Sequence, residues 1–582
     1  MDATEFFEHP QAAAHKQYEA LRAFYVENKS AAEVAQQVGY TLSSFYSLTR
    51  DFNRQLKHPH PSQHFFVRPS RGRKPKASTD STQQLIIDLR KKYLSVPDIK
   101  VMLDAMGHSV SERHIYDILE QAGFSRLPRR SKQQHREAIA NVQLSAPATE
   151  MLTYTQETFS SRQGIDLLCL LPYINSYGIY SLIAQSEYPE SQTLNRACSI
   201  LSFVALKLSN IRRYSADDGW CMDRGLGFFA GLNVLPKAAW FSSYSHRVTR
   251  AMNLEFLKSL HACWTQHGLL GECANLDFVT IPYWGKAGHL ENNWSGTRHK
   301  SLSSILAIGA QDPHTGIITY GNTNIRHAHK SAVVLEFLDF YRADGTESLN
   351  YLIFDSQLTT YENLKKLDDN PNPIKFITIR RRGKCIVDEL NALPKSQWRN
   401  LRVPAADAKG RVLKVHEQIV FLKGYGKNIR QVAITGNGKI KPALMITNDF
   451  ELSLEKIIRK YAQRWLVEQE ISEHIHLFHL NQVSSSMVIK VDFDLTMSIL
   501  AHNLYRLLAQ DLPGFSHSTA VTVFEKFIDN DGQVQVGEDS VKVILKKKRH
   551  LPMLLTAMER FEHQPISWIQ NRKFSIMADT RS

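Results

Sequence analysis

The chain has 582 residues, too many for one hydrophobic core, so its length predicts about three or four domains. Hydrophobic residues make up 43% and charged residues 22%, values that exclude an intrinsically disordered chain. The net charge of +14 at pH 7 indicates a polyanionic partner, because Lys and Arg side chains that neutralise phosphates release counterions.

The sequence carries no sign of secretion or of a membrane anchor. Its six cysteines are scattered and form no Cys-x-x-Cys pair, which argues against a zinc site and indicates a reducing compartment. The N-terminal segment MDATEFFEHP lacks an apolar core, and the longest apolar stretches, such as 167–174 and 200–208, are too short to span a bilayer. We therefore expect a soluble, cytoplasmic protein without a membrane partner.

Residues 1–60 have the spacing of a helix-turn-helix unit. The second of three expected helices ends at Gly39, and the third begins with Thr41 or Ser43 as its N-cap. Phe45, Tyr46 and Leu48 are expected to face inward. The third helix, over about 43–50, would enter a major groove, so Ser43 is a candidate DNA contact.

The same layout recurs in residues 81–140, after a basic linker over 61–80 that Pro and Gly keep from being helical. Ser111 is the expected N-cap of its last helix and leaves Arg113 on the outer face. The candidate phosphate contacts of the two basic segments and this helix are Arg71, Arg73, Lys74, Arg113, Arg129 and Arg130. The alternative for either unit is a small helical module for packing or dimerisation.

Residues 141–270 predict a helical domain, and from residue 275 the pattern changes to alternating strands and helices. Strands are expected over 275–282, 302–311, 316–324, 350–354 and 375–379, with helices over 331–341 and 361–367. This order, βββαβαβ, is that of a ribonuclease-H-like α/β sheet, in which the first and fourth strands are neighbours. The fold class is thus multidomain, with N-terminal helix-turn-helix units before this core.

The neighbouring strands place Asp277 beside Asp355. Two adjacent carboxylates do not both ionise comfortably without a cation, and Mg²⁺ prefers oxygen ligands. A third carboxylate is expected on a helix over 454–480, where Tyr461, Arg464 and Glu468 share one face. Glu468 is therefore the third candidate ligand, and two metal ions would clamp the attacking and leaving oxygens of a phosphoryl transfer.

The motifs around these residues resemble those of the bacterial insertion-sequence DDE transposases that carry a Tyr-Arg-Glu-Lys signature. YAQRWLVE, residues 461–468, is similar to the Tyr-x-x-Arg-x-x-x-Glu part of that signature. FDSQLTTYENL and LDFVTIPYWG resemble the regions of the second and first Asp. The resemblance covers residues 275 to about 508 and implies a catalytic core in two segments, 271–384 and 448–515. A β-rich insertion over 385–447 would separate them, and a C-terminal region over 516–582 follows.

The resemblance implies an enzyme that hydrolyses the phosphodiester at the ends of its element and joins the 3′-hydroxyl to target DNA. Asp277, Asp355 and Glu468 would bind two Mg²⁺ or Mn²⁺ ions, and Tyr461 and Arg464 would contact phosphates at the element end. The implied partners are double-stranded DNA, as terminal repeats and as target, and a second copy of the chain in a homodimer. The implied location is the bacterial cytoplasm, in association with the nucleoid.

Several alternatives stay open. The family signature ends in Lys, where this chain has Ile475, so a catalytically inactive, transposase-derived DNA-binding or regulatory protein is a second hypothesis. A nuclease that cuts without joining is a third. Trp284 and Trp294 could stack on an extruded base, although packing is the favoured interpretation. The basic runs 380–382 and 546–549 are either phosphate contacts or solvated charge.

Overall fold

The computed structural model divides the chain into two compact units, residues 1–143 and residues 144–582. The residues it describes are 2, 7, 9–57, 79–91, 95–105, 108, 110–124, 149–162, 164–191, 193–211, 217–283, 290–295, 300–343, 349–358, 360–381, 383–403, 411–436, 442–464, 477–480 and 488–580.

The first unit begins with three helices, α2 (Ala13–Tyr25), α3 (Ala31–Val38) and α4 (Leu42–Leu56). Ser30 caps α3 in a reciprocal capping box with Glu33, and Gly39 ends that helix at φ 70°. Thr41, rather than Ser43, caps α4 by accepting a hydrogen bond from the Ser44 backbone N–H. A small core of Ala, Val, Leu and Phe side chains joins the three helices.

One inward-facing residue of α4 was wrongly predicted. Phe45 is fully buried, but Tyr46 is 54% exposed. Residues 45 and 46 are about 100° apart around a helix, and the narrow core of three short helices covers only the direction of Phe45.

Three further helices form a second small core in the first unit. They are α5 (Thr79–Lys91), α6 (Val96–Ala105) and α7 (Glu112–Gln121). The Ser111 side chain accepts a hydrogen bond from the His114 N–H at 3.3 Å, which confirms its predicted capping role. Both groups of three helices thus have apolar centres of their own.

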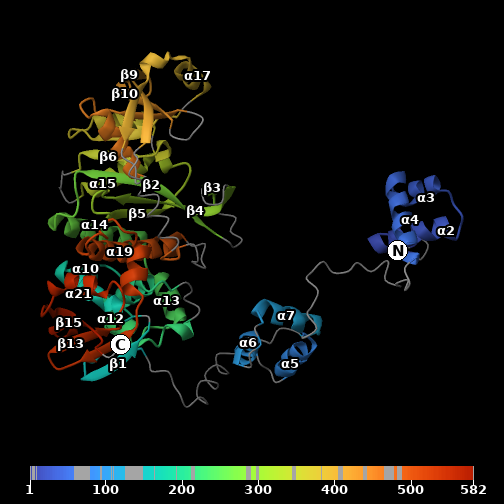
Figure 1. Cartoon of the computed structure of the whole chain (residues 1–582), viewed down its shortest axis with the longest axis horizontal. Helices are drawn as coiled ribbons and strands as arrows, with labels where there is room; N and C mark the ends of the chain where they lie inside the picture. Colours follow the sequence, from blue (N-terminus) through green and yellow to red (C-terminus); the bar gives the residue numbers. More distant parts are fainter. Residues whose placement is uncertain are drawn as a thin grey trace. The chain divides into compact units, whose positions relative to one another are not determined.

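The second unit is built around a ten-stranded sheet (Figure 1). Its first five core strands are β2 (Cys273–Pro282), β4 (Lys300–Gln311), β5 (Ile318–Ile325), β6 (Tyr351–Phe354) and β7 (Lys375–Ile379), with a short β3 (Asn292–Ser295) beside β4. β5, β4 and β2 pair antiparallel, whereas β2, β6 and β7 run parallel. The predicted adjacency of the first and fourth expected strands is confirmed by the pairing of β2 with β6.

Strands also form in the expected insertion, and they continue the same sheet. These strands are β8 (Arg399–Val403), β9 (Arg411–Leu422), β10 (Lys427–Thr435) and β11 (Ala443–Thr447). β11 pairs antiparallel with β7, and β10, β9 and β8 follow outward in that order. The segment therefore extends the core sheet and adds a helix, α17 (Lys384–Ala392), beside it.

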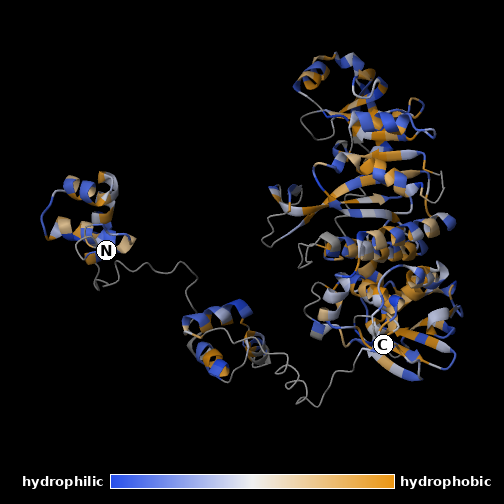
Figure 2. Ribbon diagram, turned by 180° about the vertical axis from the view of Figure 1, so that it is seen from behind, coloured by the Kyte–Doolittle hydropathy of each residue, from blue (hydrophilic) through white to orange (hydrophobic). Residues whose placement is uncertain are grey.

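Helices cover both faces of the central strands of the sheet, whereas Val412, Ile419 and Phe421 of the outer strand β9 are exposed. One face packs against α14 (Arg250–Gln266), α15 (Val333–Tyr341), α16 (Tyr361–Asp368) and α19 (Val488–Asp511). The other face packs against a helix over 454–464. In Figure 2 the strands of this sheet are coloured partly as hydrophobic and partly as hydrophilic. The central strand β6 is buried in every residue, as a strand with two covered faces requires.

The rest of the second unit brings residues 149–266 together with the C-terminal region. Its helices are α9 (Leu171–Ser176), α10 (Ile179–Gln185), α11 (Arg196–Leu208), α12 (Arg224–Phe229), α13 (Ala238–Ser245), α20 (Ala520–Val523) and α21 (Leu551–Glu559). A five-stranded sheet joins β1 (Glu157–Ser161) to β12 (Gly532–Val536), β13 (Ser540–Leu545), β15 (Arg572–Ala578) and β14 (Pro565–Ile566). These elements share one large core, in which α11 is buried along nearly its whole length.

Among the described residues no single helix is long and apolar enough to cross a membrane. One pair, 166–176 with 179–185, meets that requirement only jointly and bends by 74° between its halves.

Candidate active site

The sheet brings Asp277 and Asp355 to neighbouring positions. Leu276 of β2 lies beside Phe354 of β6 in a parallel pair, so the next residue of each strand is an aspartate. β6 ends there, and the Asp355 carboxylate accepts a hydrogen bond from the Gln357 N–H at 2.9 Å, which starts a turn. The pairing that the sequence predicted for these two aspartates is therefore present at the carboxyl end of β6.

Asp277 is almost completely buried, with 7% of its surface exposed. Its Oδ1 accepts a hydrogen bond from the Phe278 N–H at 2.8 Å. Its Oδ2 forms an ion pair with Nη1 of Arg464, whose side chain is also buried. A buried carboxylate requires such a partner, because an isolated charge would be strongly disfavoured away from water.

Arg464 and Tyr461 come from the helix over 454–464, where Ile457, Ile458 and Tyr461 pack onto the sheet. The Arg464 guanidinium lies 5.2 Å from the centre of the Tyr461 ring, within the range of a cation–π contact. Burial lowers the pKa of Arg464, but the charges of Asp277 and Asp355 outweigh it and hold the pKa above its ordinary value. Burial, with smaller contributions from the same aspartates, raises the pKa of Tyr461, which keeps the phenol neutral. Four of the predicted site residues thus interact electrostatically.

The third candidate ligand, Glu468, lies outside the described residues. Across the described part of the chain, no group of three or more His, Cys, Asp or Glu side chains is arranged to hold a metal ion. The two aspartates offer the carboxylate oxygens that Mg²⁺ and Mn²⁺ prefer, and the pair demands a cation, a role that Arg464 fills here. These donors fit a divalent metal, provided that a further oxygen ligand joins them.

Basic residues follow the next strand at the same edge of the sheet. β7 runs parallel to β6, with Thr378 beside Phe354, so Arg380 and Arg381 follow the strand end near the aspartates. Arg380 donates to Oε1 of Gln431 at 2.5 Å, while Arg381 is exposed. Arg380 and Arg381, the described residues of the run noted in the sequence, therefore lie at the edge that carries the acidic pair.

Sequence reasoning missed Asn275, which lies two residues before Asp277 on the same face of β2. Its side chain is fully buried, and neither of its amide atoms has a hydrogen-bond partner among the described residues. An amide inside an otherwise apolar strand was the available signal, because buried polar groups without partners are rare.

The predicted DNA-contacting residues of the first unit are placed only in part. Ser43 is exposed on the first turn of α4. Arg113 is exposed on α7, where it pairs with Asp117 at 3.1 Å and lies over the Tyr116 ring. The predicted contacts that lie outside the described residues are Arg71, Arg73, Lys74, Arg129 and Arg130.

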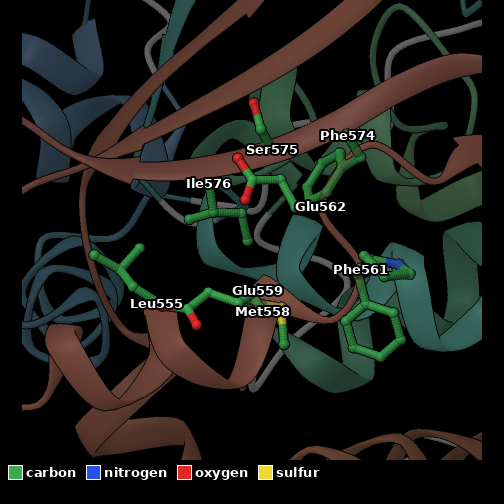
Figure 3. Close-up of a pocket in the computed structure, with 9 residues that line it drawn as sticks. Leu555, Met558, Glu559, Phe561, Glu562, Phe574, Ser575 and Ile576 are labelled. Atoms are coloured by element: carbon green, nitrogen blue, oxygen red, sulfur yellow. The ribbon is translucent and has the colours of Figure 1, made fainter.

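Two further features lie apart from the acidic pair: a tryptophan on β3 and a small cavity. Trp294 of β3 is 63% exposed, whereas Trp284 lies outside the described residues. The cavity, of about 150 Å³, opens between α21 and β15 and is lined by side chains such as Met558, Phe561 and Phe574 (Figure 3). None of the predicted site residues lines this cavity.

Comparison with known proteins gives one informative match. Residues 284–504, less than half of the chain, match the family model described as a transposase DDE domain. This range contains Asp355 and Glu468 and begins seven residues after Asp277. No curated protein matches the chain.

Among solved structures, the chain is similar to a piggyBac transposase in a synaptic complex with hairpin DNA. The identity is 12% and the TM-score 0.33, with 60% of this chain and 78% of the other covered. Residues 284–504 are similar to the DDE domain of transposases, which supports a transposase as the class of this protein.

Proposed function

We propose that the chain is a DDE transposase with a ribonuclease-H-like core, which cleaves the ends of its own element and joins them to target DNA. The observation that carries this proposal is the placement of Asp277, within β2, beside Asp355, directly after the parallel strand β6, with Arg464 paired to Asp277. The match of residues 284–504 to a transposase DDE domain supports the same conclusion.

In this proposal, Asp277, Asp355 and Glu468 hold divalent metal, Mg²⁺ or Mn²⁺, as two ions. When bound, the metal stabilises the negative charge that develops at the scissile phosphate. Tyr461 and Arg464 bind and orient a phosphate of the element end, and Arg380 and Arg381 attract the DNA backbone to the same edge. The exposed surfaces of α4 and α7, with Ser43 and Arg113, read the terminal repeats. A homodimer would let one copy act on the end that the other has bound.

The test is cleavage of a labelled duplex that carries the terminal repeat flanking the gene, with full-length protein and either Mg²⁺ or Mn²⁺. Asp355→Asn should lower the cleavage rate by at least about 100-fold, because a metal ligand supports several kcal/mol of transition-state stabilisation. Asp339→Asn is the matched control, since Asp339 is exposed on α15 and this variant should cleave at the wild-type rate. Equal rates for wild-type protein and Asp355→Asn would remove the catalytic proposal.

The second candidate is a transposase-derived protein that binds DNA without cutting it. The observation that favours it is Ile475 at the position where the resembling family has Lys. Wild-type protein that binds the terminal repeat and leaves it uncut under all metal conditions would establish this alternative. Cleavage without joined products would instead identify a nuclease.

A further inference from the structure

Both carboxylate oxygens of Asp277 already have partners in the arrangement seen here. Its Oδ1 accepts from the Phe278 N–H, and its Oδ2 is paired with Arg464. The side chains of Arg464 and Asp277 are only 8% and 10% exposed, so little water competes with the guanidinium for this oxygen. A divalent cation at Oδ2 would therefore compete with the guanidinium for this oxygen.

The charges allow one positive group at a time. Asp277 and Asp355 both attract Arg464, and a metal ion placed between the two carboxylates would repel a guanidinium that remained paired with Asp277. Removing Arg464 without a replacement would leave a buried carboxylate unpaired, which is costly. Metal and Arg464 are therefore alternative counter-ions for one acidic pair.

The helix provides a place for the displaced guanidinium. Arg464 lies over the Tyr461 ring at 5.2 Å, and that ring is anchored on the sheet in the core with Ile457 and Ile458. The planar guanidinium can keep this aromatic contact while its N–H groups turn from Asp277 to an oxygen of a nearby phosphate. Lys could not combine stacking with a bidentate grip in this way.

We propose that Arg464 is a positioning residue that exchanges partners: it neutralises Asp277 in the metal-free protein and is released to a DNA phosphate when a divalent cation takes its place. The exchange rests on the proposed function, because it requires Asp277 to be a metal ligand. The exchange couples metal binding to DNA binding. Arg464 contacts the DNA phosphate only when the metal that cleavage requires is bound.

The test measures Mn²⁺ binding to the full chain without DNA, by calorimetric titration, together with thermal unfolding with and without Mn²⁺. Arg464→Gln should bind Mn²⁺ about tenfold more tightly than wild type, because the competing charge is gone. Without metal, Arg464→Gln should also unfold at a lower temperature than wild type. Saturating Mn²⁺ should remove this difference in unfolding temperature. Arg464→Lys keeps the charge and should bind Mn²⁺ close to the wild-type affinity.

The matched control is Arg459→Gln on the same helix. Arg459 is half exposed and pairs with Glu455 at 2.5 Å, so its loss should change neither Mn²⁺ affinity nor the effect of metal on unfolding. Unchanged or weaker Mn²⁺ binding by Arg464→Gln would overturn the exchange and make the ion pair a permanent structural contact. If Asp277→Asn bound Mn²⁺ as tightly as wild type, Asp277 would not be a metal ligand. That result would overturn both the metal site and the exchange.

A measurement on the unaltered protein covers the case in which Arg464→Gln does not fold. A crystal structure of the wild-type chain with Mn²⁺ should show the Arg464 guanidinium away from Oδ2 of Asp277 and still over the Tyr461 ring. A guanidinium that stays paired with Asp277 beside the bound ion would refute the exchange.

Discussion

At the scale of single residues, several polar side chains are buried along α19. His502 is fully buried there, and its Nε2–H donates to the Gly316 carbonyl oxygen at 3.0 Å. Burial, and to a smaller extent the charge of Arg506, lowers the pKa of His502 to about 3. The imidazole is thus neutral in the folded protein over the whole physiological range.

The lowered pKa of His502 predicts that the folded protein loses stability in mild acid. Between pH 6.5 and about 3 the unfolded chain binds a proton that the folded chain does not, so stability falls as pH falls below the unfolded pKa. From pH 7 to pH 5 the contribution of His502 is about 2 kcal/mol, at about 1.4 kcal/mol per pKa unit. Urea unfolding at both pH values should show a smaller acid-induced loss for His502→Gln than for wild type. His314→Gln, at an exposed histidine, should behave like wild type.

At the scale of elements, the turn between β4 and β5 shows how the core hairpin is fixed. Asp312 Oδ1 accepts hydrogen bonds from the backbone N–H groups of His314 and Thr315, and its Oδ2 accepts one from Gly271 N–H. Gly316 closes the turn at φ 73°, a conformation that favours glycine. Arg506 of α19 lies against it and is held by the carbonyls of Thr315, Ser516 and Ser518.

Gly316→Ala should destabilise the second unit by about 2 kcal/mol or more. The positive φ alone costs about 1–2 kcal/mol for a residue with a Cβ, and the new Cβ would lie 2.5 Å from Nε of the anchored Arg506. Gly514→Ala is the matched control, because Gly514 has φ 78° but no neighbouring atom within 4 Å of the place where a Cβ would stand. Equal losses for the two variants in urea unfolding would show that the contact with Arg506 adds nothing.

At the scale of the whole molecule, the hydrophobic cores divide the chain into two compact units. The two three-helix cores draw all their residues from 1–143, and the larger cores draw theirs from 144–582. The second unit depends on both of its ends, because β1 pairs with β12 and Ser161 donates to Asp223 at 2.7 Å. Residues 149–162 and the C-terminal region therefore belong to the same folded unit.

A fragment of residues 144–582 should fold alone, with the same urea midpoint as the main transition of the full chain, and should lose specific binding to the terminal repeat. The comparison fragment, residues 163–582, lacks β1 and leaves the edge of β12 exposed, so it should aggregate or unfold at lower urea. Circular dichroism and gel filtration would report both results. A 144–582 fragment that retained specific DNA binding would contradict the assignment of end recognition to the first unit.

The sequence by itself determined the elements whose pattern is local. Helical spacing and capping residues such as Ser111 located the short N-terminal helices. Apolar runs located β2, β6 and β7, with Asp277 inside β2 and Asp355 directly after β6. These patterns depend on neighbours within a few residues, so they can be read along the chain.

Only the tertiary structure decided which distant segments meet. It joined β1 to β12, extended the core sheet through β11, and paired Arg464 with Asp277 across 187 residues of sequence. Such contacts are selected by packing and by the need to pair buried charge, and several partners for each segment are equally compatible with its local pattern. The ion pair of Arg464 with Asp277 is an example, because no local pattern indicates which distant cation neutralises the buried carboxylate.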